Sequence, residues 1–451
     1  MNRWTILAIW MLTANVSLAE PWPMYRHDAR RSAVTDERIA FPLHQQWVRT
    51  SKQPPQTAWT GPAKWDAYSG NSGLQSMRNF DPCFFVTVVD GRVYFGSSVD
   101  DAAHSIDAET GKEQWVQFTG AAVRFPPTID SGRAYFGSDD GFVYCCDASS
   151  GDLIWKRRAA TESKRITSNR KLISMWPVRT GVLVHDGMAC FAGSLVPWEK
   201  SFLWKVDAAT GETNTAKSFR TEITGVTLQG ALLASPKKLY VPQGRAAPLA
   251  FDSRSGKSLG AIGEAGGVFC VLTEDEMLLA GPQHQKAASN EIRVADGNTT
   301  RRLASFSGTN RILVSGNHAW IPTAGKLKML DRKSYVDAEI KINAASKIIS
   351  DKKRKDVASK ATAEVNRKLA IEQRNGAWRW EIDCPSPHGF IKTTNAIILG
   401  LKDEVRAYDP GNGKLRWQAK VEGTAQGLAV ADGQLFVSTG LGHIYAFGPS
   451  Q

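Results

Sequence analysis

The sequence predicts an all-β fold, and three observations support that prediction. First, a short motif recurs along the 451 residues, with an Asp, a Gly four residues later and a Trp eight residues later. Second, a β-prone run bounded by turn residues accompanies these copies along the chain. Third, 42% of the residues are apolar, enough for a large core, and 22% are charged, too few for a disordered polyelectrolyte. Self-similarity of this kind indicates one repeated antiparallel unit.

The recurring motif is clearest in three segments: SIDAETGKEQW (105–115), CCDASSGDLIW (145–155) and AYDPGNGKLRW (407–417). Weaker copies bring the motif aspartates to seven: Asp107, Asp147, Asp207, Asp252, Asp296, Asp331 and Asp409. An Asp side chain can accept hydrogen bonds from backbone N–H groups two or three residues on, and Gly can adopt positive φ, so the two residues suit a tight turn. We expect the Trp to pack between neighbouring units.

Eight short β-prone runs are spaced along the chain, and most stand before a motif Asp. They are residues 91–97, 132–138, 187–194, 237–244, 276–282, 318–325, 396–403 and 434–440. We expect each repeat to form a four-stranded antiparallel blade: an innermost strand, this second run, a third strand that ends at the Asp turn, and the Trp strand. The predicted fold is therefore a β-propeller. The last run has no Trp strand after it, whereas LHQQWVRT (43–50) has a Trp and no blade. We therefore expect eight blades, closed by the N-terminal strand, which removes exposed sheet edges.

Residues 335–374 interrupt the repeat and predict a helical insertion inside one blade. They contain no Pro, and the apolar or small residues Val357, Ala361, Val365 and Leu369 recur every four positions. Opposite charges also stand four residues apart at two places, Asp356–Lys360 and Glu364–Lys368. The run DKKRKD (351–356) could contact phosphate or an acidic surface, but a solvated helix face is the favoured interpretation.

The first 19 residues resemble an export signal. A short basic start is followed by the apolar segment TILAIWML (5–12) and by small residues before a cleavage point at Glu20. The apolar segment is too short to span a bilayer, and no cysteine for lipid attachment precedes Cys83. We expect a cleaved signal at 1–19 and a single propeller domain at 20–451, monomeric and located in the periplasm or outside the cell.

The charge balance leaves the partner open. The formal net charge is +12 and the pI is about 9.4, which favours an acidic partner but is common in soluble proteins without one. We find no Walker loop, no GxSxG and no HExxH motif, and the histidines and cysteines lack metal-site spacing. The segment HDAR (27–30) is interpreted as a tie between blades and not as a catalytic pair.

The motif at Asp107–Trp115 resembles the repeat of pyrroloquinoline-quinone (PQQ) enzymes. The opening WPMYRHDARRSAVT (22–35) resembles the N-terminal arm of exported bacterial PQQ-binding-like β-propellers. The resemblance spans residues 22–448 and implies the propeller fold. It is specific for the fold and says little about activity, because one fold hosts many functions.

Cys145 and Cys146 are adjacent and allow two interpretations. Quinone dehydrogenases also contain Cys-Cys-Asp, with a vicinal disulfide in a loop over the cofactor. Here the pair falls in the strand before the Asp147 turn, where neighbouring side chains point to opposite faces. A vicinal disulfide needs both sulfurs on one side. Two packing cysteines are therefore favoured over a redox pair.

Residues just before each innermost strand should ring the mouth of the central channel, where propellers usually bind ligands. The candidates are Arg124, Phe125, Trp176, Arg179, Gln229, Arg311 and His388, with Asp81 and Gln426 beside them and Arg245 after a second-strand run. Arginines with aromatics can form a site for an anion or a sugar acid. The arginines could equally bond to carbonyls of neighbouring blades, and both interpretations stay open.

Three functions are compatible with these residues. The preferred one is an exported, non-catalytic propeller that binds an anionic small molecule, a glycan or an envelope protein, with no nucleic-acid partner and no assigned cofactor. The second is a dehydrogenase of alcohols or sugars that depends on PQQ and calcium, although we can assign no calcium ligands. The third is a scaffold similar to the propeller lipoprotein of outer-membrane β-barrel assembly, which the missing lipid cysteine weakens.

Overall fold

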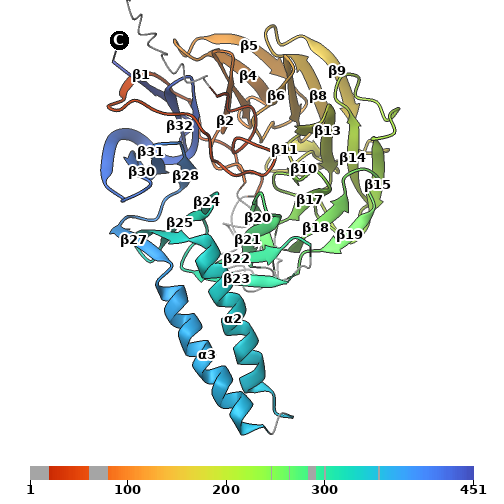
Figure 1. Cartoon of the computed structure of the whole chain (residues 1–451). Helices are drawn as coiled ribbons and strands as arrows, with labels where there is room; N and C mark the ends of the chain where they lie inside the picture. Colours follow the sequence, from red (N-terminus) through yellow and green to blue (C-terminus); the bar gives the residue numbers. More distant parts are fainter. Residues whose placement is uncertain are drawn as a thin grey trace, which may run out of the picture.

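The computed structural model describes residues 20–59, 80–244, 246–263, 265–282, 291–298, 301–353 and 356–450. The predicted export signal at 1–19 and Arg245 lie outside these residues. The described strands form a ring of four-stranded antiparallel blades around a central channel, and a pair of helices projects from the ring (Figure 1). No helix among the described residues is long and apolar enough to cross a membrane.

The first four blades follow one another along the chain. Blade one contains β2 (Val86–Val89), β3 (Arg92–Ser97), β4 (Ala102–Asp107) and β5 (Glu113–Phe118). Blade two contains β6 (Thr128–Asp130), β7 (Arg133–Gly137), β8 (Phe142–Asp147) and β9 (Leu153–Arg158). The hairpin of β10 (Arg165–Ser168) and β11 (Lys171–Ser174) comes next. Blade three contains β12 (Leu183–His185), β13 (Met188–Gly193), β14 (Ser201–Asp207) and β15 (Phe219–Ile223). Blade four contains β16 (Leu233–Ala234), β17 (Lys238–Gln243), β18 (Ala246–Asp252) and β19 (Ser258–Ala261).

The remaining four blades complete the ring. Blade five contains β20 (Ala265–Leu272), β21 (Met277–Pro282), β22 (Glu291–Asp296) and β23 (Arg302–Ser307). Blade six contains β24 (Leu313–Ser315), β25 (His318–Thr323), β26 (Lys326–Asp331) and β27 (Trp378–Asp383). Blade seven contains β28 (Gly389–Lys392), β29 (Ile397–Gly400), β30 (Lys402–Tyr408) and the start of β31 (Leu415–Ala431). Blade eight contains the end of β31, β32 (Gln434–Thr439), β33 (Ile444–Gly448) and β1 (His44–Arg49). The predicted eight-bladed, all-β fold is confirmed.

The Asp motif makes the turn that was predicted for it. In blade one, the side chain of Asp107 accepts a hydrogen bond from the backbone N–H of Thr110 at 2.8 Å. Gly111 donates its N–H to the Asp107 carbonyl at 2.9 Å and has a φ of 70°. A Cβ at Gly111 would lie 2.8 Å from the ring of Trp47, so the turn is also the place where a neighbouring blade packs.

In blades one and two, the Trp strand docks on the turn of the next blade. Trp115 of blade one packs on Gly151 of blade two, and its Nε1 donates to the Ala148 carbonyl at 3.0 Å. Trp155 repeats this contact on blade three, with Nε1 to the Ala208 carbonyl at 3.0 Å. The predicted packing of the Trp between blades is therefore confirmed. The Trp joins neighbouring blades through the apolar surface that it buries and through a hydrogen bond.

The ring is closed by the N-terminal strand, as predicted. β1 pairs antiparallel with β33, with Val48 opposite Tyr445. Trp47 of β1 then makes the interblade contact of blade eight, donating its Nε1 to the Ala108 carbonyl of blade one at 2.9 Å. Strands from the two ends of the chain therefore share one blade, and no open edge is left between blades eight and one.

The insertion in blade six is a helical hairpin of two helices. α2 (Arg332–Ser350) and α3 (Val357–Asn375) begin three residues before, and end one residue after, the predicted bounds 335–374. The repeat residue Asp331 caps α2 by accepting the Ser334 N–H. The expected pairing of Asp356 with Lys360 is replaced by a cap, because the Asp356 side chain accepts the Ser359 N–H at 3.2 Å.

The residues before β1 form an arm, residues 20–40, that crosses the middle of the ring (Figure 1). It bonds to the innermost strands of five blades through the backbone pairs Trp22–Val88, Pro23–Ile129, Ala29–Ala234, Arg30–Leu272 and Thr35–Lys392. Because these contacts fall at or near the ends of the innermost strands, the arm covers the channel on the face opposite to the predicted mouth. The arm therefore brings its own side chains into the channel.

Candidate functional site

The channel contains aromatic side chains from both the arm and the blades. The ring of Tyr25 from the arm makes edge contacts with Phe85 and Phe125, with centroids 4.9 and 5.1 Å away. Phe80 stacks on Phe125 at 5.3 Å with an interplanar angle of 6°. Trp59 packs against the same cluster. Together these contacts give the channel an apolar lining between the arm and the mouth.

Arg124 and Arg179, predicted at the mouth, are buried and ion-paired. Arg179 forms a two-pronged contact with Asp139, at 2.9 Å from Nε and 2.8 Å from Nη2. Arg124 bridges Asp139 at 2.7 Å and Asp81 at 2.5 Å. Burial alone would raise the pKa of Asp139, but the two arginines outweigh it and lower that pKa to about 2. The two guanidiniums therefore already hold carboxylates of the chain itself.

Three other predicted mouth residues bind neighbouring parts of the chain. Trp176 is buried and donates its Nε1 to the Lys200 carbonyl at 2.6 Å. Gln229 accepts a hydrogen bond from Trp59 Nε1 at 2.6 Å. Phe125 belongs to the aromatic cluster of the channel. Each of these residues therefore has a packing or bonding role within the chain, and their position at the mouth stays a prediction.

Arg311 and His388, also predicted at the mouth, lie beside a residue that the sequence did not mark. Arg311 donates from Nε and Nη2 to the His388 carbonyl at 3.3 and 3.2 Å. Its guanidinium lies 5.3 Å from the ring centroid of Phe269. The guanidinium of Arg26, from the arm, lies 4.9 Å from the same centroid. Two arginines from distant parts of the sequence therefore share one aromatic ring.

Neither Arg26 nor Arg311 forms an ion pair with a carboxylate within the described residues. Arg26 donates Nε to the Arg31 carbonyl at 3.0 Å, while its buried Nη2 has no hydrogen-bond partner there. Burial lowers the pKa of Arg26 to about 10, and the charge of Arg311 adds to that effect. Burial also lowers the pKa of Arg311. Both arginines are only partly exposed and their like charges repel, so this part of the channel would gain from a bound anion.

The sequence could not have identified Arg26 or Phe269 as channel residues. Arg26 stands in the arm segment WPMYRHDARR, whose path through the ring depends on backbone contacts with several blades. Phe269 lies in β20, where the pairing with β21 shifts register between Gly266 and Cys270. That irregularity turns the strand in a way that no repeat pattern reports.

The cysteines are arranged for packing. All six are free and buried. Cys145 belongs to the core between blades two and three, whereas Cys146 belongs to the core between blades one and two. Burial raises the pKa of Cys145 to about 11 and that of Cys146 to about 12, so neither is a thiolate at neutral pH.

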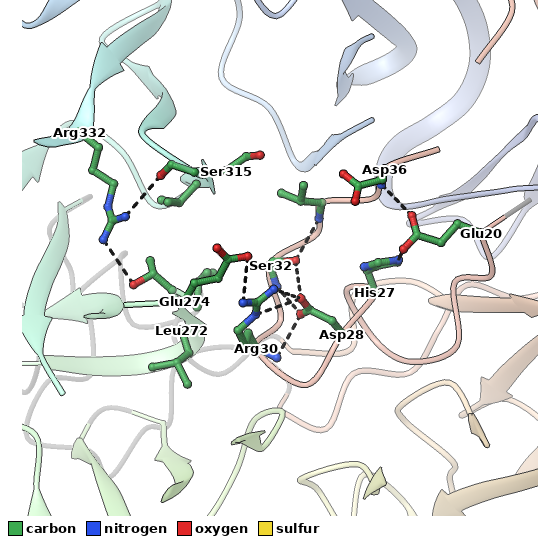
Figure 2. A pocket seen from close by; sticks show the side chains of 15 residues that line it. Glu20, His27, Asp28, Arg30, Ser32, Asp36, Leu272, Glu274, Ser315 and Arg332 are labelled. Atoms are coloured by element: carbon green, nitrogen blue, oxygen red, sulfur yellow. Dashed lines mark hydrogen bonds and ion pairs between the residues drawn. The ribbon is translucent and has the colours of Figure 1, made fainter. Parts of the chain in front are cut away.

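A second hollow of about 190 Å³ lies between the arm and blades five and six, and Figure 2 shows the side chains around it. Asp28 accepts bonds from the N–H and hydroxyl of Ser32, both at 2.9 Å. Arg30 pairs with Glu274 across the hollow at 3.1 Å. His27 lies 3.5 Å from Glu20. The charged groups thus hold the arm to itself and to blade five, which agrees with the interpretation of HDAR as a tie.

The described residues supply no carboxylate cluster for the calcium that would accompany a quinone. Among them, no three His, Cys, Asp or Glu side chains are grouped to hold a metal ion. Asp81 and Asp139, the carboxylates at the mouth, are engaged by Arg124 and Arg179. We therefore assign no reaction step to such a group.

The fold and the channel define the chain as a β-propeller built from PQQ-type repeats. The family model described as outer membrane protein assembly factor BamB matches residues 56–187, 99–263 and 401–451. These matches cover more than half of the sequence, and the chain belongs to this family of PQQ-repeat propellers. No curated protein sequence shows a significant match to the chain.

Solved structures with a similar fold include BamB and two dehydrogenases. BamB from Moraxella catarrhalis is 13% identical, with a TM-score of 0.51, over 90% of this chain and 100% of that one. A europium-containing methanol dehydrogenase is 11% identical, with a TM-score of 0.60, over 95% and 98%. A quinohemoprotein alcohol dehydrogenase from Comamonas testosteroni is 13% identical, with a TM-score of 0.60, over 96% and 81%. At these identities the likeness shows the fold alone.

Proposed function

We propose that this chain is an exported, non-catalytic binding propeller that holds an anionic ligand in its channel, near the mouth. The observation that supports it is the pair Arg26 and Arg311 over Phe269, with a buried Arg26 nitrogen that lacks a partner within the described residues. Guanidinium groups bind carboxylates, phosphates and sulfates through two parallel hydrogen bonds. An anion at this point would relieve the repulsion between the two arginines.

The other predicted arginines have different parts in this proposal. Arg124 and Arg179 remain predicted residues of the mouth, but an incoming anion would have to displace Asp139 from them. We expect their substitution to change stability more than affinity. Arg245 lies outside the described residues and stays a predicted member of the site. His388, whose backbone carbonyl accepts the hydrogen bonds of Arg311, is exposed and stays a predicted residue of the mouth.

Calorimetry with uronic acids, sulfated sugars and PQQ tests the proposal. Replacing Arg311→Lys keeps the charge but loses the planar fork, so affinity for the bound anion should fall roughly tenfold to a hundredfold. Arg254→Lys is the matched control, because Arg254 is exposed in a turn of blade four. Equal affinity of the wild type and Arg311→Lys, or an equal loss in the control, would contradict the proposal.

The dehydrogenase alternative rests on the fold shared with the quinone enzymes and is tested separately. The protein is mixed with PQQ and calcium, and dye reduction is measured with alcohols and sugars as substrates. Turnover that requires both additions would favour an enzyme over a binding propeller. A scaffold role in the envelope, the third alternative, predicts instead a stable complex with an envelope protein. A pull-down from an envelope extract tests for that complex.

A further inference from the structure

The helical hairpin of α2 and α3 reaches away from the ring into solvent (Figure 1). Its base is fixed to blade six, because Asp331 donates its N–H to the Ala377 carbonyl at 2.8 Å. Each helix has 19 residues and is therefore about 29 Å long. The end of the hairpin, which we call the tip, is defined by Lys347, Lys352, Lys353, Val357 and Lys360.

The lysines of the tip have no acidic partners within the described residues. The two nearby carboxylates accept hydrogen bonds from backbone N–H groups: Asp351 from Lys353 at 2.9 Å and Asp356 from Ser359 at 3.2 Å. At the base, by contrast, Arg374 pairs with Glu339 at 2.9 Å and Arg332 pairs with Asp275. Lys333, Lys341, Arg367 and Lys368 also have no acidic partner among the described residues, but they are spread along the two helices, whereas four lysines gather at the tip. In the sequence, two further basic residues at 354 and 355 complete this run.

The tip also carries apolar surface. The hairpin is held together by small side chains, because Ala363 and Ala370 of α3 and Ala338 and Ala345 of α2 are buried. Val357 begins α3 on the outside of that contact and is 79% exposed. An exposed valine close in sequence to four lysines without acidic partners in the described residues suits a surface that meets lipid headgroups.

We propose that the tip docks on a membrane surface made of anionic lipids. The lysine ammonium groups would lie among the lipid phosphates, and Val357 would enter the boundary between headgroups and acyl chains. A lysine ammonium is a mobile point charge, whereas the arginine guanidinium is a planar fork that matches one fixed carboxylate. Lysines therefore suit a fluid layer of lipid phosphates better than a fixed carboxylate on a protein. The hairpin would then hold the ring about one helix length from the membrane.

Flotation with lipid vesicles tests this proposal on the whole protein. Wild type should bind vesicles that contain phosphatidylglycerol and should not bind pure phosphatidylcholine. Raising the ionic strength from about 0.1 M to about 1 M shortens the screening length from ~10 Å to ~3 Å, so bound protein should be released. The double change Lys352→Gln and Lys353→Gln should weaken binding roughly thirtyfold, because each lysine near an anionic surface contributes about one factor of five.

Matched variants separate the tip from general charge. Lys257→Gln with Lys414→Gln removes the same charge from exposed turns of blades four and seven and should change binding less than twofold. Val357→Ser should weaken binding severalfold without changing charge. No binding of wild type to the anionic vesicles, or an equal loss in the control pair, would overturn the proposal. Binding of a dissolved anion in the channel is measured independently, so each proposal can fail alone.

Discussion

At the scale of single residues, the two cysteines of β8 show how strand geometry decides chemistry. Cys145 and Cys146 are fully buried and belong to different cores on either side of blade two. Their raised pKa values of about 11 and 12 leave almost no thiolate near pH 7. We predict that the native protein shows no fast reaction with Ellman's reagent and that all six thiols react after denaturation. A rapid native reaction, or fewer than six thiols in denaturant without reductant, would indicate a disulfide or an accessible pair.

Asp139 is a buried carboxylate that holds two of the arginines predicted at the mouth. Its carboxylate is held by Arg124 and Arg179, all three buried. Removing one partner of a buried pair typically costs about 3–5 kcal/mol, so Asp139→Asn should lower the free energy of unfolding by roughly that amount. Glu381→Gln, in an exposed pair with Lys326, should change it little. Urea unfolding measures both, and equal small effects would contradict the prediction.

The ion pairs of Asp139 with Arg124 and Arg179 should make the free energy of unfolding depend on pH. Asp139 titrates at about 2 in the folded protein against an ordinary value of 3.8. A depressed pKa stabilises the folded state above the unfolded value, so this contribution is complete above about pH 4 and is lost as the pH falls toward 2. The difference in unfolding free energy between wild type and Asp139→Asn should therefore shrink across that window.

At the scale of elements, the sequence could predict the strands and turns that recur in every blade. It could not predict features that depend on a single contact between distant residues. The Asp turns, the Trp strands and the split blade follow from spacing alone, because each blade uses the same local chemistry. The pairing of Arg179 with Asp139 could not be predicted, since it joins residues 40 positions apart in neighbouring blades. The entry of Arg26 into the channel also depends on the whole ring being assembled.

The hairpin of α2 and α3 is the element whose removal tests its independence from the ring. Asp331 and Ala377 are joined by a backbone hydrogen bond of 2.8 Å, so a short turn can replace the residues between them. We predict that replacing 332–376 with a turn copied from residues 108–111 leaves a single cooperative unfolding transition. Tyr335, which packs on Phe306 and Trp378, is lost in this variant, so some loss of stability is expected. Circular dichroism in urea measures the transition, and loss of the folded state would show that the hairpin is part of the ring.

At the scale of the whole molecule, Trp47 tests the closure of the ring with one substitution. Its ring covers Gly111 of blade one, and its Nε1 donates to the Ala108 carbonyl at 2.9 Å. Because the side chain is only partly buried, Trp47→Ala should cost about 2–3 kcal/mol of unfolding free energy. Trp47→Phe keeps most of the packing and should cost about 1 kcal/mol for the lost hydrogen bond. Equal stabilities of the two variants would argue against the interblade contact.

Removing both β1 and the arm should destabilise the ring more than losing the Trp47 contact between blades eight and one. A chain that starts after residue 50 loses β1, which exposes the edge of β33 along its pairing from Ile444 to Gly448. It also loses the arm, whose backbone bonds join the innermost strands of five blades and whose Tyr25 packs on Phe85 and Phe125. An open sheet edge pairs readily with other chains, and the emptied channel leaves aromatic side chains without their contacts. We therefore predict aggregation of the shortened chain in size-exclusion chromatography, under conditions where the full chain is monomeric. A stable shortened monomer would mean that seven complete blades hold the ring together without its closing strand.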